Sequence, residues 1–265
     1  MDYHYISIVI PVFNVDTKIL HKSLESISKQ THLFYEAIII DDSTHLECSK
    51  FCFDYCSSDS RFRYYKTEKR LGLSKSLNFG ISIAKHDLIA RFDSDDICFL
   101  NRLELQINYL NKNNHIDVLG GAIQIINNLE EVKSIRSYPI ETNKIRRGMQ
   151  IDCSIAHPTV IFKKQLVTDY GGYDETFIYS EDIEMWLRWL NNGVRFSNLD
   201  VPLIKFRQNE FIRNSEHYKY FLKARLRNFN FKLMPFNFIG ILILLLTQIV
   251  PDNMMELYYR YKYNG

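Results

Sequence analysis

The chain contains a dense group of carboxylates, Asp93, Asp95 and Asp96, placed directly after a short apolar run, 88–92. Aspartate is a poor strand former, and neighbouring like charges repel one another unless a counter-charge neutralises them. Oxygen ligands two residues apart suit Mg²⁺ or Mn²⁺, hard cations that often also hold substrate phosphates. Taken alone, such a cluster is more simply interpreted as a solvated acidic turn. The cation hypothesis therefore depends on what the rest of the chain supplies.

A second pair of acids, Glu181 and Asp182, opens a segment with helical periodicity. Ser180 before them suits a helix N-cap, and acids in the first turn face the positive end of the helix dipole. These two carboxylates either complement that dipole or serve chemistry, and the local pattern leaves both interpretations open.

The elements that would position these acids alternate along the first hundred residues. We expect strands at 5–12, 36–40, 62–65 and 88–92, and helices at 17–30, 46–56 and 74–84. This alternation predicts a mostly parallel sheet with helices on both faces. Ligands of such sheets bind outside the carboxyl ends of the strands. Three of these ends carry polar or aromatic groups, at 11–14, 41–42 and 93–96.

The second half of the chain is expected to complete this domain. Helices are predicted at 101–113, 143–149 and 164–170 and from 180 onward, and strands at 117–126, 134–140, 194–196 and 202–206. Gly120 and Gly121 interrupt one of these strands, which predicts a bulge or a close backbone approach. The chain lacks G-x-G-x-x-G and G-x-x-x-x-G-K-[ST] patterns, which weighs against a nicotinamide enzyme and a P-loop ATPase.

Composition excludes several classes of protein. The chain has 265 residues, 46% of them hydrophobic, enough for one large α/β domain with or without an appendage. A net charge of +2 gives no reason to expect nucleic-acid binding. The five cysteines form no Cys-x-x-Cys pair; Cys48, Cys52 and Cys56 share a helix face and are expected to be buried hydrophobes, with a metal site there as the weaker alternative. Residues 1–5 show no secretory signal, so a cytoplasmic location is expected.

The C-terminal part, 207–265, differs in character from the rest. Between Lys205 and Lys232 there are eight basic residues and two acidic ones. A basic helix is expected at 218–231, followed by a mostly apolar run at 237–250 that is too short to span a bilayer as a helix. Aromatic and basic residues follow at 258–263. This pattern favours an interfacial helix at a membrane surface over a core helix.

Several segments together resemble the inverting family 2 glycosyltransferases of the GT-A fold, which use a nucleotide-sugar donor. The matching segments, in chain order, are 7–14 (SIVIPVFN), 38–43 (IIIDDS), 71–78 (LGLSKSLN), 89–97 (IARFDSDDI), 157–160 (HPTV) and 181–188 (EDIEMWLR). The resemblance covers about 1–206, with 1–100 as the nucleotide-binding half and 101–206 as the acceptor and catalytic half. It is strongest to bacterial enzymes of O-antigen and exopolysaccharide synthesis, often galactosyl- or glucosyltransferases that act on lipid-linked acceptors.

The resemblance implies a role for each matching residue. Asp182 would be the general base, with Glu181 as the second candidate, and Asp95, helped by Asp93, would bind Mn²⁺ or Mg²⁺. The residues expected to contact a UDP-sugar are Pro11, Phe13, Asp42, Asp41, Asp93 and Lys75, with Arg70 as a further positive charge. His157 would contact the acceptor or the metal, or only fix its own loop, and Arg188 would orient the acidic pair.

The expected function is metal-dependent transfer of a hexose to a polyprenyl-diphosphate-linked sugar, at the cytoplasmic face of the cell membrane. Two alternatives are a nucleotidyltransferase that makes an activated sugar and an inactive sugar- or membrane-binding module. The first would need a glycine- and arginine-rich loop after the first strand, which 11–16 lacks. Two departures bear on base recognition: Ser43 follows the paired aspartates where the family has glycine, and Phe13 replaces the more usual tyrosine. The sequence leaves the sugars, the linkage and the oligomeric state open.

Overall fold

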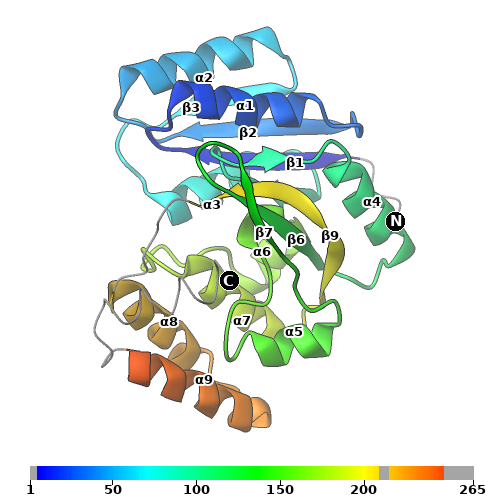
Figure 1. Cartoon of the computed structure of the whole chain (residues 1–265), viewed down its shortest axis with the longest axis vertical. Helices are drawn as coiled ribbons and strands as arrows, with labels where there is room; N and C mark the ends of the chain where they lie inside the picture. Colours follow the sequence, from blue (N-terminus) through cyan, green and yellow to red (C-terminus); the bar gives the residue numbers. More distant parts are fainter. Residues whose placement is uncertain (1–4, 209–214, 248–265) are drawn as a thin grey trace.

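The computed structural model describes residues 5–208 and 215–247 and shows a mixed α/β fold built on one nine-stranded sheet (Figure 1). The strands are β1 (Ile6–Val12), β2 (Tyr35–Asp41), β3 (Phe62–Lys66), β4 (Leu88–Arg91), β5 (Ile97–Cys98), β6 (Val118–Ile126), β7 (Val132–Arg136), β8 (Ile161–Lys163) and β9 (Phe196–Arg207). The α-helices are α1 (Thr17–Ser28), α2 (Leu46–Ser58), α3 (Leu73–Ile83), α4 (Arg102–Lys112), α5 (Thr142–Gly148), α6 (Gln165–Tyr170), α7 (Glu181–Asn191), α8 (Ser215–Arg227) and α9 (Met234–Thr247).

The sheet changes character between the two halves of the chain. β3, β2, β1 and β4 lie side by side in that order and are all parallel. β8 pairs antiparallel with β4, and in the remainder only β6 and β9 are parallel. The predicted parallel sheet is therefore confirmed for the first hundred residues, and the second half is mixed. Because β1, β2 and β4 are parallel neighbours, the segments that follow them meet at one edge of the sheet.

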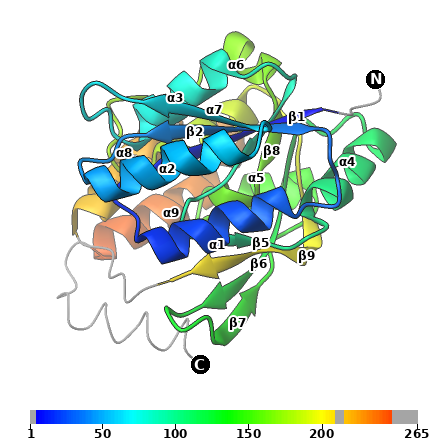
Figure 2. The same ribbon diagram turned by 90° about the horizontal axis from the view of Figure 1, so that it is seen from above.

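Two hydrophobic cores cover the two faces of the sheet, as alternation along the buried strands requires. Val9 and Ile38 face one core, which α3, α7 and α8 complete. Ile8 and Ile39 face the other, which α1, α2 and α4 complete. Figure 2 shows α1 and α2 side by side, with α3 on the other side of β1 and β2.

Two details of the second half differ from or refine the predicted strands. The two predicted closing strands are one continuous strand, β9, which bulges at Asp200 and Val201 where its register against β6 shifts. The shift occurs beside Gly121, where a β-carbon would lie 2.5 Å from the Leu203 side chain, so the predicted close approach is confirmed. The two-residue strand β5 was not predicted, because only its pairing with β9 defines it.

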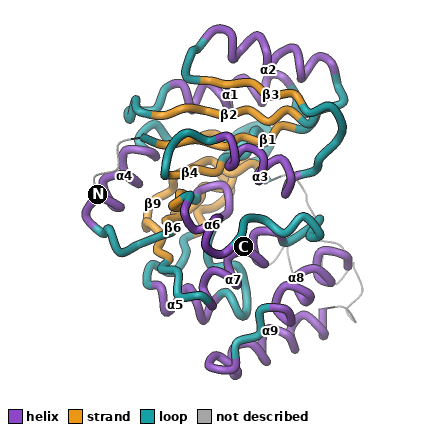
Figure 3. Tube along the Cα trace, turned by 180° about the vertical axis from the view of Figure 1, so that it is seen from behind, coloured by secondary structure: helices purple, strands orange, loops and turns teal. Residues whose placement is uncertain are grey.

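Helices α8 and α9 pack against each other at the end of the molecule opposite α2 (Figures 1 and 3). Each begins three residues earlier than predicted. Residues 1–4, 209–214 and 248–265 lie outside the described part of the chain, and with them the end of the predicted apolar run and the aromatic segment 258–263.

Candidate active site

The smaller of two neighbouring cavities lies where β1, β2 and β4 end. It has a volume of about 310 Å³ and includes the start of α3 in its wall. The residues that line it are Pro11, Val12, Phe13, Val15, Asp42, Arg70, Gly72, Leu73, Ser76, Asp93, Ser94 and Asp95. The structure thus gathers most of the predicted donor residues and both predicted metal ligands in one place.

Asp42 fixes the loop that closes one side of this cavity. Its carboxylate accepts hydrogen bonds from the backbone N–H groups of Leu71 (2.7 Å) and Gly72 (2.8 Å) and from the Thr67 hydroxyl (2.8 Å). Gly72 has a φ of +81°, a conformation that side chains disfavour. A carboxylate has about four acceptor positions, so Asp42 can hold this loop and still accept an N–H from a bound base.

Asp41, the adjacent candidate, has a structural role instead. It is fully buried, and its carboxylate accepts hydrogen bonds from the Ser43 backbone N–H (2.9 Å) and the Tyr64 hydroxyl (2.8 Å). Its side chain has no surface with which to contact a donor. The donor contact predicted for Asp41 is therefore contradicted by its burial, and Asp42 is the one that faces the cavity.

Phe13 provides a flat apolar surface at the cavity, with 42% of the residue exposed. The Arg70 guanidinium lies over its ring, 4.4 Å from the ring centroid. The next residue, Asn14, has a φ of +51° and accepts hydrogen bonds from the backbone N–H groups of Thr44 (2.8 Å) and His45 (2.9 Å). Asn14 thereby ties the end of β1 to the loop after β2, which fixes the orientation of Phe13. An exposed ring held this way is suited to stacking with a nucleobase.

The three carboxylates after β4 occupy different environments. Asp93 pairs with the buried guanidinium of Arg91. Asp96 is buried, and one of its oxygens accepts the backbone N–H of Arg207 (2.8 Å), so it joins β4 to β9. Burial, and then the charge of Asp93, raise the pKa of Asp95 to about 6. Of the three, Asp93 and Asp95 line the smaller cavity.

These two carboxylates fit a divalent cation that a diphosphate would help to hold. Mg²⁺ sites at substrate phosphates use one or two protein carboxylates and complete their octahedron with phosphate and water. Burial, and then the negative charge of Asp93, raise the pKa of Asp95, and a bound cation would offset both effects. Across residues 5–208 and 215–247, no group of three or more His, Cys, Asp or Glu residues is arranged to enclose a metal ion. The alternative metal site at Cys48, Cys52 and Cys56 is therefore wrong.

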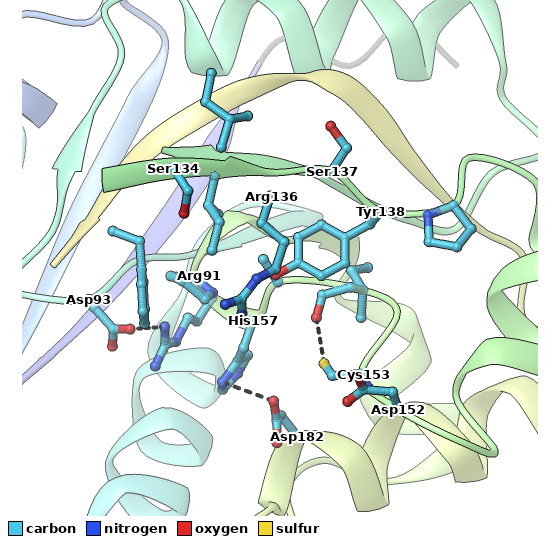
Figure 4. Close-up of a pocket in the computed structure, with 17 residues that line it drawn as sticks. Arg91, Asp93, Ser134, Arg136, Ser137, Tyr138, Asp152, Cys153, His157 and Asp182 are labelled. Carbon is cyan, nitrogen blue, oxygen red and sulfur yellow. Dashed lines mark hydrogen bonds and ion pairs between the residues drawn. The ribbon is translucent and has the colours of Figure 1, made fainter. Parts of the chain in front are cut away.

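The larger cavity, of about 650 Å³, lies on the other side of Asp93 (Figure 4). It is bounded by β7 and the segment that follows it, by the loop around 152–158 and by the start of α7. Its lining residues are Arg91, Asp93, Ile123, Ser134, Ile135, Arg136, Ser137, Tyr138, Pro139, Asp152, Cys153, Ile155, Ala156, His157, Pro158, Asp182 and Phe206. Asp93 is common to both cavities, so a molecule in one can meet a molecule in the other at this residue.

Glu181 and Asp182 begin α7 but meet different surroundings. Glu181 is buried, and burial followed by the charge of Asp182 raises its pKa to about 8, which favours its protonated form. Asp182 keeps 20% of its side chain exposed and faces the larger cavity. Ser180 has a φ of +59° and makes no side-chain cap, which contradicts its predicted capping role. Of the two acids, Asp182 is therefore the one whose carboxylate a molecule in the larger cavity could reach.

His157 lies in the wall of the larger cavity, beside Asp182 (Figure 4). One ring nitrogen, Nε2, hydrogen-bonds the Tyr173 hydroxyl (2.7 Å), and Nδ1 lies 4.0 Å from an Asp182 oxygen. Burial, then the charge of Arg91, hold the pKa of His157 well below its ordinary value. The residue is therefore a neutral imidazole packed against Tyr173 and Trp186, and the part it exposes faces the cavity beside Asp182.

Besides the buried Asp41 and Glu181, two further predicted site residues, Arg188 and Lys75, line neither cavity. Arg188 binds Glu184 (2.8 Å) and donates to the backbone oxygens of Tyr170, Gly171 and Gly172, so it fastens α7 to the end of α6. Its predicted role in orienting the acidic pair is contradicted by these contacts. Lys75 is exposed on α3 and is not part of either cavity wall.

Several cavity residues were not predicted. Ser76 is buried in the wall of the smaller cavity, and its hydroxyl has no partner among the described residues. Arg136, Tyr138 and Asp152 line the larger cavity. No motif marks them, because an edge strand and two irregular segments bring them together only in the folded chain.

The parallel half of the sheet forms a small acidic pocket at its strand ends, and the mixed half places a carboxylate beside that pocket. This is the arrangement of a GT-A glycosyltransferase. The family model for glycosyl transferase family 2 matches residues 7–171, and the chain belongs to this family. The protein is thus a glycosyltransferase, which removes the nucleotidyltransferase alternative.

Three relatives from Escherichia coli are similar over most of their length. The O-antigen biosynthesis glycosyltransferase WbnJ is 36% identical over 76% of this chain and 79% of its own. A UDP-Gal:alpha-D-GlcNAc-diphosphoundecaprenol beta-1,3-galactosyltransferase is 30% identical over 76% of this chain and 73% of its own. WfgD, a UDP-Glc:alpha-D-GlcNAc-diphosphoundecaprenol beta-1,3-glucosyltransferase, is 30% identical over 83% of both chains.

Among solved structures, TarS of S. aureus has the same fold. The two structures superpose with a TM-score of 0.64 at 19% sequence identity. The match covers 84% of this chain and 39% of the TarS chain. A shorter form of TarS, residues 1–349, was solved in complex with UDP-GlcNAc and matches with the same TM-score over 65% of its length. This likeness confirms the predicted GT-A fold.

Proposed function

We propose that this glycosyltransferase moves a hexose, galactose or glucose, from a UDP-sugar to a sugar carried on a polyprenyl diphosphate, with inversion at the anomeric carbon. One observation carries the proposal: Asp93 forms a wall shared by a small acidic cavity and a larger cavity that contains Asp182. The names of two relatives, which use UDP-Gal and UDP-Glc on a GlcNAc-diphosphoundecaprenol acceptor, support the choice of substrates.

The donor would occupy the smaller cavity. Its base would stack on Phe13 beside Arg70 and donate its imide N–H to Asp42, while its diphosphate would point toward Asp93 and Asp95. Asp93 and Asp95 would hold Mn²⁺ or Mg²⁺, which neutralises charge on the departing diphosphate when it is bound. Arg91 holds the Asp93 carboxylate in position through their ion pair.

The acceptor would occupy the larger cavity, with its reacting hydroxyl between Asp182 and the donor sugar. As the hydroxyl oxygen forms the new bond to the anomeric carbon, Asp182 takes its proton. The bond from that carbon to the diphosphate oxygen breaks on the opposite side, and UDP leaves with the electron pair. Neutral His157, held by Tyr173 at 2.7 Å, packs beside Asp182 and limits the space in which the carboxylate can move.

A panel of nucleotide-sugars tests the donor assignment. Ligands that bind the folded state raise the melting temperature in proportion to the logarithm of their concentration over Kd. We expect UDP-galactose or UDP-glucose with Mn²⁺ to stabilise the protein more than GDP- or dTDP-sugars, and EDTA to abolish the effect. Stabilisation by a GDP-sugar, or by UDP equally well in EDTA, would contradict the donor or the metal assignment respectively.

A further inference from the structure

Helix α9 presents an unusual surface for a helix at the end of a globular domain. It contains no charged residue, and large apolar side chains are exposed around most of its circumference. Those at least 40% exposed are Met234, Phe238, Ile239, Leu242, Ile243, Leu245 and Leu246. A contiguous apolar surface of this kind marks an interaction site.

The helix is nevertheless firmly seated along one narrow stripe, formed by Asn237, Gly240 and Leu244. A β-carbon at Gly240 would lie 1.7 Å from the backbone oxygen of Gln150, so only glycine allows this contact. Asn237 caps the preceding turn by donating to the backbone oxygens of Asn230 (3.3 Å) and Leu233 (2.9 Å). The apolar side chains outside this stripe are therefore exposed on a helix whose position is fixed.

The seat of α9 is continuous with the larger cavity. Gln150 and Ile151, on which Gly240 packs, immediately precede Asp152 and Cys153 in the cavity wall. Ile151, which contacts Gly240 of α9, is directly followed in sequence by Asp152, which lines the larger cavity. The segment 150–153 therefore both seats α9 and forms part of the wall of the larger cavity.

Basic residues border the apolar surface. The exposed Arg147 of α5 places its guanidinium 5.7 Å from the centre of the Phe236 ring, and Lys232 is exposed just before α9. Lys219 is exposed on α8, which packs against α9. An uncharged apolar helix flanked by cations complements anionic lipid, since each basic residue near such a surface contributes about 1 kcal/mol. Within the described ranges, no single helix is both long and apolar enough to cross a bilayer.

We propose that α9 lies in the surface of a membrane that contains anionic phospholipid, with Arg147, Lys219 and Lys232 at the level of the headgroups. The docked helix holds the loop at 150–153, and with it the acceptor cavity, next to the lipid surface. Membrane docking is argued from α9 and the basic residues that border it, and it does not depend on the proposed function. Delivery of a lipid-linked acceptor to this cavity rests in addition on the proposed function.

Vesicle flotation of the full chain tests the docking surface. We expect the protein to float with vesicles that contain phosphatidylglycerol and to bind less to pure phosphatidylcholine. The double variant Leu242→Glu/Leu246→Glu should lose at least about tenfold in vesicle affinity, because it removes two buried leucines from the lipid. The matched control is Leu46→Glu, since Leu46 is 86% exposed on α2 at the opposite end of the molecule. Its affinity should equal that of the wild type.

Two further measurements separate this inference from the proposed function. Transfer to a water-soluble, short-chain acceptor should be unchanged in the double variant, whereas transfer to a long-chain acceptor in vesicles should fall with vesicle affinity. An unchanged melting temperature would show that the variant is folded. Unaltered vesicle binding by the folded double variant would overturn the docking surface, as would wild-type protein that self-associates through α9 and does not bind vesicles. Loss of transfer to both acceptors would instead count against the proposed active site.

Discussion

The consecutive acids Glu181 and Asp182 show how position within one helical turn separates two identical functional groups. Asp182 reaches the larger cavity, whereas Glu181 turns into the protein and is 7% exposed. Burial raises the pKa of Glu181 from its ordinary value of 4.5 to about 8. The sequence predicts a base in this pair, but only the packing around the two side chains shows which carboxylate a substrate could reach.

The raised pKa of Glu181 predicts a pH-dependent stability. The folded protein binds this proton more tightly than the unfolded chain, so stability falls as pH rises from about 4.5 to about 8. Glu181→Gln keeps the shape without the charge. We expect thermal unfolding to show the variant more stable than the wild type at pH 8 and above, with the difference vanishing below pH 4.5. An equal difference at all pH values would contradict this explanation.

Loss of the Ser76 hydroxyl should weaken UDP binding without destabilising the fold. Its hydroxyl is buried without a partner in the smaller cavity, so we expect Ser76→Ala to leave the melting temperature unchanged or slightly raised. The affinity for UDP should fall about fivefold, the equivalent of one hydrogen bond of about 1 kcal/mol. The matched control is Ser74→Ala, because Ser74 donates to the Phe177 backbone oxygen (3.1 Å). Ser74→Ala should lower the melting temperature. Unchanged UDP affinity in Ser76→Ala would refute the assignment of Ser76 to the UDP site.

At the scale of elements, α3 connects the core to the donor cavity. Its first turn contributes Leu73 and Ser76 to the cavity wall, and Gly80 near its centre lies against β1. A β-carbon at Gly80 would lie 2.4 Å from the Val9 side chain, which is stiff at its branched β-carbon. The distance between helix and strand is therefore set by a glycine that sequence patterning alone would count as a weak point in a helix.

Gly80→Ala tests whether this close packing positions the cavity. The added methyl group should push α3 away from β1 and cost about 1–3 kcal/mol of unfolding free energy, despite the better helix propensity of alanine. UDP affinity should fall as well, because Ser76 and Leu73 move with the helix. Chemical denaturation and UDP titration measure the two effects, with Ser82→Ala, on the exposed side of α3, as the control. A stabilised Gly80→Ala protein would contradict this account of the packing.

The alternation of strands and helices was predictable because each element carries its own periodicity and its own end signals. The parallel order of the first four strands followed from that alternation. What depends on distant partners was not predictable: β5 exists through its pairing with β9, and β9 is continuous because it bulges at Asp200. The role of Arg188 was predicted wrongly for the same reason, because its backbone partners at the end of α6 lie at least 16 residues away in sequence.

At the scale of the whole molecule, the proposals assign three functions to three parts of the fold. The proposed donor cavity forms at the strand ends of the parallel half, the proposed acceptor cavity forms within the mixed half, and α9 lies at one end of the molecule. The sequence predicts the first of these well, because carboxyl ends of parallel strands must converge. It does not predict the second, since the cavity walls come from β7, the loop at 152–158 and α7, which are distant in sequence.

The central claim is that Asp182 serves the acceptor while Asp93 and Asp95 serve the donor. The most direct test measures UDP affinity with Mn²⁺ and the rate of sugar transfer for Asp182→Asn and Asp95→Asn side by side. We predict that Asp182→Asn binds UDP as the wild type does and transfers sugar about 100- to 10,000-fold more slowly, whereas Asp95→Asn loses both. Near-normal transfer by Asp182→Asn, or a loss of its UDP affinity equal to that of Asp95→Asn, would contradict the assignment.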